Sequence, residues 1–256
     1  MTIAELQVYS VEEADVAGGL CTVRCIGGVA RTGQVYAAGD ARLGLRGIER
    51  HGHRAGSLRA GQAARVRLTG AMTALLARGQ VLTAVPPGGH ALADLEAWLA
   101  TDPPLADEPH PLTLRSHGVS GMQDDALPDG VRLRWGRVAL AAVDRTAAWA
   151  ERHPLDHAID RAGVRAYLIR QFGPGPCLGG DPAGLCRELL DLIDLTPAQA
   201  AAEGLAWRDL PRRRIRHLRR IKLMLNSMAT VRPHLAGASD TARAVDAWAG
   251  VRAVLP

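Results

Sequence analysis

Arginines near the carboxyl end of the chain are the residues best suited to bind a ligand. Residues 208–222 hold eight basic side chains and one acidic one, Asp209, the predicted N-cap. Ile215, Leu218 and Ile221 recur at helical spacing, which predicts a helix over 210–229 with one buried face. Five arginines remain on its outer face: Arg212, Arg213, Arg216, Arg219 and Arg220. Such a face suits contacts with nucleic-acid phosphates.

These arginines have a second interpretation, which the sequence leaves open. They could form a solvated face whose charge is balanced inside the chain by Asp191, Asp194 or Glu203. No aromatic residue lies among the arginines, so stacking of bases on this helix is not predicted. If the helix binds RNA, it does so through phosphates.

Nucleotide chemistry is not predicted. A phosphate-binding loop needs a lysine that follows a glycine-rich turn. The chain has one lysine, Lys222, and no glycine-rich run leads to it. We therefore expect neither GTP nor ATP as a cofactor, and no GTPase activity from this chain alone.

Metal binding and catalysis have equally little support. Cys21 and Cys25 share one face of a predicted strand, and buried cysteine usually behaves as a small apolar residue. His51 and His53 lie in a loop without a second pair at zinc-ligand spacing. We expect no metal, no cofactor and no catalytic residues, and a binding protein is favoured over an enzyme. An enzyme with its site in the helical part stays as a second alternative.

The elements that would position these residues begin with strands. Glu5–Val11, Leu20–Ile26 and Ala63–Leu68 are expected to be strands, and in the last of them residues 64–68 alternate between apolar and charged. Residues 86–89, Pro-Pro-Gly-Gly, cannot continue a strand. We place a domain boundary there, so that residues 1–86 form a first domain.

The rest of the chain divides into a linker and a helical domain. Residues 87–130 are expected to hold one short helix and an irregular segment in which only Pro111–Arg115 is extended. Within 131–256, residues 131–143 fit a hairpin or a helix. Caps at Asp181 and Thr196 then mark helix starts. Further helices are expected at 154–172, 182–194, 197–203, 210–229 and 240–254.

One stretch resembles a known family. It consists of Arg59-Ala60-Gly61, the strand Ala63–Leu68, Gly70 and Arg78–Leu82, in this order and without a gap. The stretch is similar to the closing half of domain 2 of the translational GTPases, the small barrel of elongation factor Tu and its relatives. Residues 21–36 resemble the opening half, so the resemblance covers about residues 3–84. It implies an antiparallel β-barrel and, with the helices, an α+β fold.

The resemblance also implies a partner. In that family the barrel binds RNA or a ribosomal surface, which implies tRNA or the ribosome here. Thr69 stands where elongation factor Tu has an arginine, which argues against tRNA-specific contacts. Since related barrels make only protein contacts in some proteins, a protein-interaction or regulatory module without nucleic acid is the alternative.

Composition is consistent with a globular protein. The 256 residues are 47% hydrophobic, with a formal net charge of +5. No apolar run approaches the ~20 residues that cross a bilayer, and the acidic, broken start does not read as a signal peptide. We therefore expect a cytoplasmic protein that makes no contact with membranes. Four cysteines in a chain of this length do not predict a disulfide framework.

Overall fold

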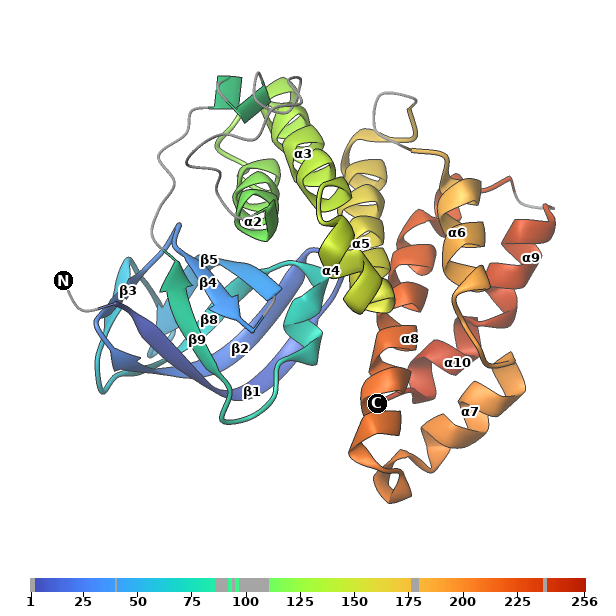
Figure 1. The fold of residues 1–256 in the computed structure, drawn as a ribbon, viewed down its shortest axis with the longest axis horizontal. Helices are drawn as coiled ribbons and strands as arrows, with labels where there is room; N and C mark the ends of the chain where they lie inside the picture. Colours follow the sequence, from blue (N-terminus) through green and yellow to red (C-terminus); the bar gives the residue numbers. More distant parts are fainter. Residues whose placement is uncertain are drawn as a thin grey trace. The chain divides into compact units, whose positions relative to one another are not determined.

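The computed structural model describes residues 3–39, 41–85, 92–93, 95–96, 111–175, 180–236 and 239–256. Its contacts divide the chain into two compact units, Met1–Ala148 and Trp149–Pro256, and each unit is considered by itself. The first unit holds all the described strands and two long helices, and the second is helical (Figure 1). The predicted α+β class is confirmed.

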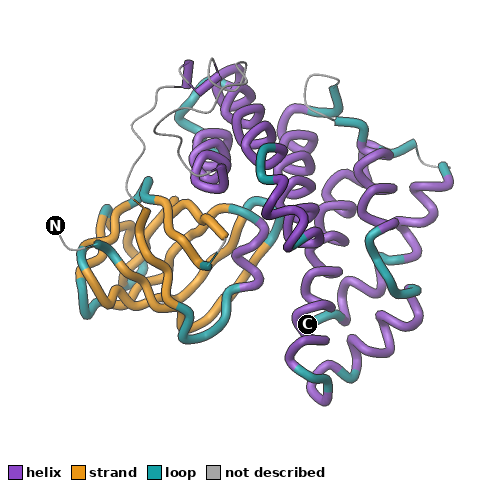
Figure 2. Tube along the Cα trace, viewed as in Figure 1, coloured by secondary structure: helices purple, strands orange, loops and turns teal. Residues whose placement is uncertain are grey.

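The strands of the first unit close into an antiparallel barrel. Six strands follow one another in the order β4-β9-β1-β2-β8-β5, and β5 pairs with β4 to close the ring. Figure 2 shows these strands in orange. The six are β1 (Glu5–Ala14), β2 (Gly18–Gly27), β4 (Val35–Ala38), β5 (Ala41–Arg50), β8 (Ala63–Thr69) and β9 (Val81–Val85). Short strands β6 (His53–Ala55), β3 (Val29–Arg31) and β7 (Ser57–Arg59) and the 3₁₀ turn η1 (Ala71–Leu75) complete it.

Alternating apolar residues fill the barrel, as the sequence predicts. In β8, Ala64, Val66 and Leu68 are buried, while the arginines between them are exposed. Cys21 and Cys25 of β2 are also fully buried, which confirms them as core residues. One face of each strand therefore builds the core, and the other face is left to carry polar side chains.

Two helices follow the barrel inside the same unit. They are α2 (Pro111–Met122) and α3 (Asp129–Asp144), so the extended conformation predicted for Pro111–Arg115 is wrong. The uncertain segment 131–143 is helical. The expected boundary at residue 86 falls inside the first unit, and independent folding of residues 1–86 stays a prediction. The short helix expected after residue 90 lies largely outside the described residues, although 92–93 and 95–96 are helical.

Packing explains why α2 is helical despite its weak helix formers. Gly118 and Gly121 lie against α3, and an added Cβ would come within 2.8 Å of Ala139 and 2.5 Å of Trp135. Leu114 of α2 is buried against α3 as well. Glycine costs about 1 kcal/mol in a helix interior, but here it permits a close helix–helix approach. Tertiary contact outweighs local propensity.

Helix α2 also packs on the barrel at the start of β5. The carbonyl oxygen of Arg42 accepts hydrogen bonds from Ser116 Oγ at 2.6 Å and from Arg115 Nη2 at 2.8 Å. Both donors belong to fully buried residues. A Cβ on Gly44 would lie 2.4 Å from Ser120 Oγ, so the missing side chain of Gly44 lets the helix approach.

The second unit is a cluster of helices. The predicted cap at Asp181 is confirmed, because its side chain accepts a hydrogen bond from the Ala183 N–H. Thr196 and Gln199 form the predicted capping box. The helices are α4 (Ala147–Arg152, which spans the division), α5 (Pro154–Phe172), α6 (Pro182–Asp191), α7 (Pro197–Leu205), α8 (Arg212–Val231), α9 (Asp240–Ala247) and α10 (Ala249–Val254), with 3₁₀ turns η3 (Trp207–Asp209) and η4 (Arg232–His234).

Two details of this unit differ from the sequence prediction. Asp209 is not the N-cap of α8, because it lies in η3 and Pro211 takes the cap position. The helix expected over 240–254 is two helices, α9 and α10, that meet at Trp248. Trp248 itself is buried. None of the helices in the described part of the chain is long and apolar enough to cross a membrane.

Candidate nucleic-acid interface

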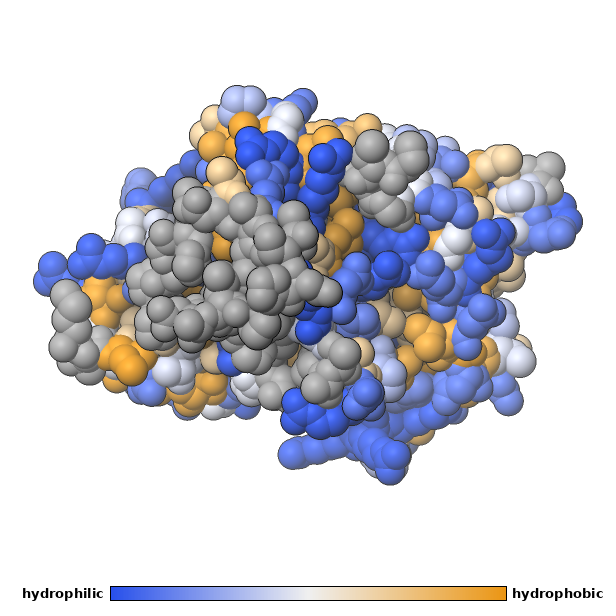
Figure 3. Space-filling model, turned by 45° about the horizontal axis from the view of Figure 1, so that its top comes forward, coloured by the Kyte–Doolittle hydropathy of each residue, from blue (hydrophilic) through white to orange (hydrophobic). Residues whose placement is uncertain are grey.

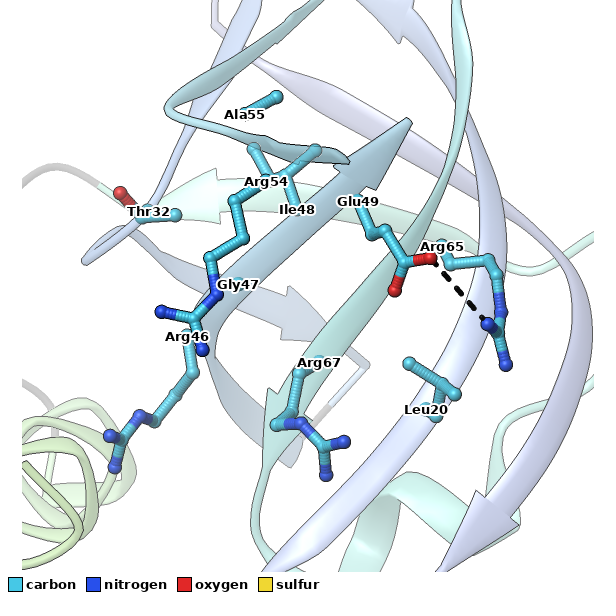
Figure 4. Close-up of a pocket in the computed structure, with 10 residues that line it drawn as sticks. All are labelled: Leu20, Thr32, Arg46, Gly47, Ile48, Glu49, Arg54, Ala55, Arg65 and Arg67. Carbon is cyan, nitrogen blue, oxygen red and sulfur yellow. Dashed lines mark ion pairs between the residues drawn. The ribbon is translucent and has the colours of Figure 1, made fainter. Parts of the chain in front are cut away.

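An arginine-lined hollow lies on the outside of the barrel, over β5, β6 and β8 (Figure 4). Its volume is about 510 Å³, within the range of small-molecule sites, roughly 300–1,000 Å³. Four arginines and one glutamate line it, and no aromatic side chain does. The lining residues are Leu20, Thr32, Arg46, Gly47, Ile48, Glu49, Arg54, Ala55, Arg65 and Arg67.

Strand register places these arginines side by side. Arg65 and Arg67 are on the exposed face of β8, two residues apart. Across the sheet Arg67 pairs with Gly47, and Glu49 pairs with both Arg65 of β8 and Arg54 of β6. Because Gly47 has no side chain, the sheet surface beside Arg67 is left open. Figure 4 shows Arg54 extending toward Arg46, with the Glu49–Arg65 ion pair on the other side of the hollow.

Two of the four arginines, Arg65 and Arg46, form hydrogen bonds with other residues of the first unit. Arg65 donates to Glu12 Oε2 from Nη2 at 2.7 Å and from Nε at 3.0 Å. A hydrogen bond from Thr22 and those from Arg65 hold the pKa of Glu12 below its usual range. Arg46 Nη1 lies 3.4 Å from the carbonyl oxygen of Ser120. These contacts fix the positions of both side chains.

The other two arginines, Arg54 and Arg67, remain available. Both are exposed, and neither forms an ion pair with a carboxylate of the described residues. Neither arginine was among the binding residues predicted from the sequence. The one local signal is the alternation in β8, which places Arg65 and Arg67 on the outer face. Nothing local indicates that β6 would bring Arg54 to them.

The five arginines predicted on the basic helix fall into two groups. Arg212, Arg213 and Arg216 are exposed and Arg219 is half-buried. None of these four pairs with a carboxylate in the described part of the unit. The predicted inner face is confirmed for Leu218, Ile221 and Leu225, which are buried, whereas Ile215 is half-buried.

Arg220 belongs to the second group. Its Nε and Nη2 atoms donate to the two carboxylate oxygens of Asp156 on α5, at 2.5 and 2.7 Å. The side chain of Asp156 is 11% exposed. Arg220 therefore holds α8 against α5, and its guanidinium is already occupied.

Two of the three expected internal partners, Glu203 and Asp194, are used, but by other residues of α8. Glu203 accepts from Arg214 Nε at 2.5 Å and from Nη2 at 2.7 Å, and this hydrogen bonding lowers the pKa of Glu203. Asp194 lies 2.7 Å from His217 Nε2. Neither Arg214 nor His217 is among the five predicted contacts, so most of those remain unneutralised.

The described residues do not meet the requirements of a metal centre. Among the described residues, no three His, Cys, Asp or Glu side chains are grouped so as to hold a metal ion. On the face drawn in Figure 3, hydrophilic residues predominate and hydrophobic ones occur in small groups between them. The two arginine groups, in separate units, are candidate sites for an anionic ligand.

Comparisons with known proteins add little. No family model and no curated protein matches the chain. Among solved structures, the chain is similar to the crystal structure of GDP-bound aIF5B from Aeropyrum pernix, with 15% identity and a TM-score of 0.31. That match covers 66% of this chain and 23% of the other, so the chain spans less than a quarter of that protein. The antiparallel barrel is established by its strand pairing, and its specific resemblance to domain 2 of the translational GTPases stays a prediction.

Proposed function

We propose that the chain is a non-catalytic RNA-binding protein whose main contact is the arginine-lined hollow of the barrel. The observation that carries this proposal is the pair Arg54 and Arg67, exposed in a hollow of about 510 Å³ and without a carboxylate partner among the described residues. One planar guanidinium group can donate two parallel hydrogen bonds to the oxygens of a phosphate. Arginine is therefore the preferred residue for such sites.

The composition of the hollow indicates which part of RNA it contacts. Base recognition in single strands uses aromatic side chains for stacking, and none lines the hollow. Phosphate contacts position a nucleic acid without reading its sequence. We therefore infer binding to the backbone, with little preference between sequences.

The outer face of α8 supplies further phosphate contacts. Arg212, Arg216 and Arg219 follow one another at spacings of four and three residues, so they share one side of the helix. Arg213 lies next to that side. Arg220 is excluded because Asp156 occupies it. The resemblance to the translation-factor barrel suggests tRNA or ribosomal RNA as the natural ligand and a cytoplasmic location.

Fluorescence anisotropy with a labelled single-stranded RNA tests the proposal. Each phosphate contact contributes a slope of roughly −0.7 to the dependence of log K on log[salt]. The double variant Arg54→Gln/Arg67→Gln should lose the same factor of affinity for RNAs of unrelated sequence. Its slope should be smaller in magnitude by about 1.4. The matched control is Arg59→Gln with Arg78→Gln, two exposed arginines of the same unit that do not line the hollow.

The control pair lowers the net charge by the same amount, so equal losses in both double variants would mean general electrostatic attraction and contradict a defined site. Absence of RNA binding at about 50 mM salt, where phosphate contacts are strong, would reject the function itself. A protein partner would then be the better explanation of the exposed arginines.

A further inference from the structure

A second pocket lies within the helical unit, where α8, α9 and α10 meet. Its volume is about 100 Å³. Leu225, Met228, Val245 and Trp248 form its floor, and all four are almost completely buried. The pocket is apolar inside and open to solvent.

The volume of the pocket limits the size of the group that can bind in it. An engineered apolar cavity of about 150 Å³ binds benzene, whereas sites for drug-sized ligands begin at about 300 Å³. A volume of about 100 Å³ therefore suits one branched aliphatic side chain. The long chain of a lipid would not fit.

The rim of the pocket is positively charged. Arg232 is neutralised by Asp246 through two hydrogen bonds of 2.7 Å. Arg252 on α10 is exposed, and no carboxylate in the described part of the chain pairs with it.

Positive charge continues beside Arg252. Lys222 donates from Nζ to the carbonyl oxygen of Leu255 at 2.7 Å, a contact that holds its ammonium group close to α10. Burial lowers the pKa of Lys222, and the charges of Arg219 and Arg252 lower it further. These three cations favour an anionic ligand beside the pocket.

We propose that this pocket binds an acidic peptide segment of a partner protein, with one leucine-like side chain in the pocket and a neighbouring carboxylate against Arg252. Tryptophan, methionine and arginine are enriched at protein interfaces, and binding energy concentrates where such residues form a pocket. Trp248, Met228 and Arg252 provide that combination at one place. Charge complementarity adds the preference for acidic neighbours.

The probe is a short peptide with a single leucine flanked on both sides by glutamate and aspartate, added to the full chain labelled with ¹⁵N. The readout is the indole N–H resonance of Trp248, assigned by its loss in Trp248→Phe. We expect a saturable shift below about 2 mM peptide, consistent with one anchoring side chain. A peptide with alanine in place of leucine should bind roughly tenfold more weakly.

Two variants of the protein separate the pocket from the charge. Ala249→Phe places a ring at the mouth of the pocket and should abolish the shift, since Ala249 is exposed and lines the pocket. Arg252→Gln should weaken binding severalfold. Arg187→Gln, an exposed arginine on α6 outside the pocket, removes the same charge and should leave binding unchanged.

Three results would overturn the proposal. The first is no shift of the Trp248 resonance with any acidic peptide. The second is equal binding of the leucine and alanine peptides, which would mean attraction by charge alone. The third is a tighter interaction with laurate than with the peptide, which would assign the pocket to a lipid.

Discussion

Arg220 and Asp156 join α8 to α5 through two hydrogen bonds between the guanidinium and both oxygens of the carboxylate. The two side chains are 24% and 11% exposed. Breaking such a pair leaves a partly buried charge without its partner, which costs more than the pair itself contributes. The contact therefore separates a structural arginine from the binding arginines on the same helix.

We expect Arg220→Gln to lower the free energy of unfolding by about 2 kcal/mol and to leave RNA affinity unchanged. Urea unfolding and anisotropy titrations measure the two effects. The control is Arg216→Gln, one turn away and exposed, which should change stability by less than about 0.5 kcal/mol while weakening RNA binding. If Arg220→Gln unfolds like the parent but loses RNA affinity, Arg220 contacts RNA and does not mainly stabilise the fold.

The substitution Gly44→Ala tests how closely α2 packs on the barrel. An added Cβ would lie 2.4 Å from Ser120 Oγ and 2.9 Å from Thr69 Oγ1, and Thr69 Oγ1 already accepts the Gly44 N–H. Gly44→Ala should therefore cost about 1–3 kcal/mol, as overpacking does, measured by urea unfolding.

Gly47 on the same strand is the matched control, because the nearest atom to its added Cβ is 3.8 Å away. Gly47→Ala should be almost neutral. If both substitutions had the same effect, the cost would reflect strand backbone rather than the contact with α2.

Truncation after residue 86 asks whether the barrel folds alone. We expect fragment 1–86 to show a strand-rich circular dichroism spectrum and a cooperative melt, but at a lower temperature than fragment 1–148. The longer fragment keeps α2, whose Arg115 and Ser116 donate to the Arg42 carbonyl, and each such hydrogen bond contributes about 0.5–1.5 kcal/mol. Equal melting temperatures would show that α2 adds nothing, and a non-cooperative short fragment would refute its independence.

Acid should remove the contribution of the Glu203–Arg214 pair. The hydrogen bond from Arg214 holds the pKa of Glu203 below its unfolded value of 4.5. The stabilisation is therefore complete above pH 4.5 and is lost as the pH falls through the lower, folded-state pKa. At neutral pH, Glu203→Gln should cost up to about 1 kcal/mol.

Urea unfolding at pH 7 and in stronger acid measures this difference. The gap between the parent and Glu203→Gln should close in acid because protonated Glu203 and Gln are both uncharged. A gap that stays constant down to about pH 2 would show that the glutamate acts through packing rather than through its charge.

Some helix starts, one strand and one helix face of this protein could be predicted from local sequence signals alone. The caps at Asp181 and Thr196 were predictable because each bonds to a backbone N–H within three residues. The strand Ala63–Leu68 was predictable from its two-residue alternation, which also exposes Arg65 and Arg67. The buried face of the basic helix follows in the same way from helical spacing.

Tertiary structure decided what depends on residues distant in the chain. Asp156 lies 64 residues from Arg220, so no local pattern could tell which arginine of α8 was occupied. Helix α2 adopted a conformation that its glycines disfavour, because Ala139 and Trp135 of α3 pack directly against Gly118 and Gly121. The hollow exists only because strand pairing brings Arg54 of β6 beside Glu49 of β5 and Arg67 of β8 beside Gly47. Such register is set by the closed barrel as a whole, since each strand's position depends on its neighbours.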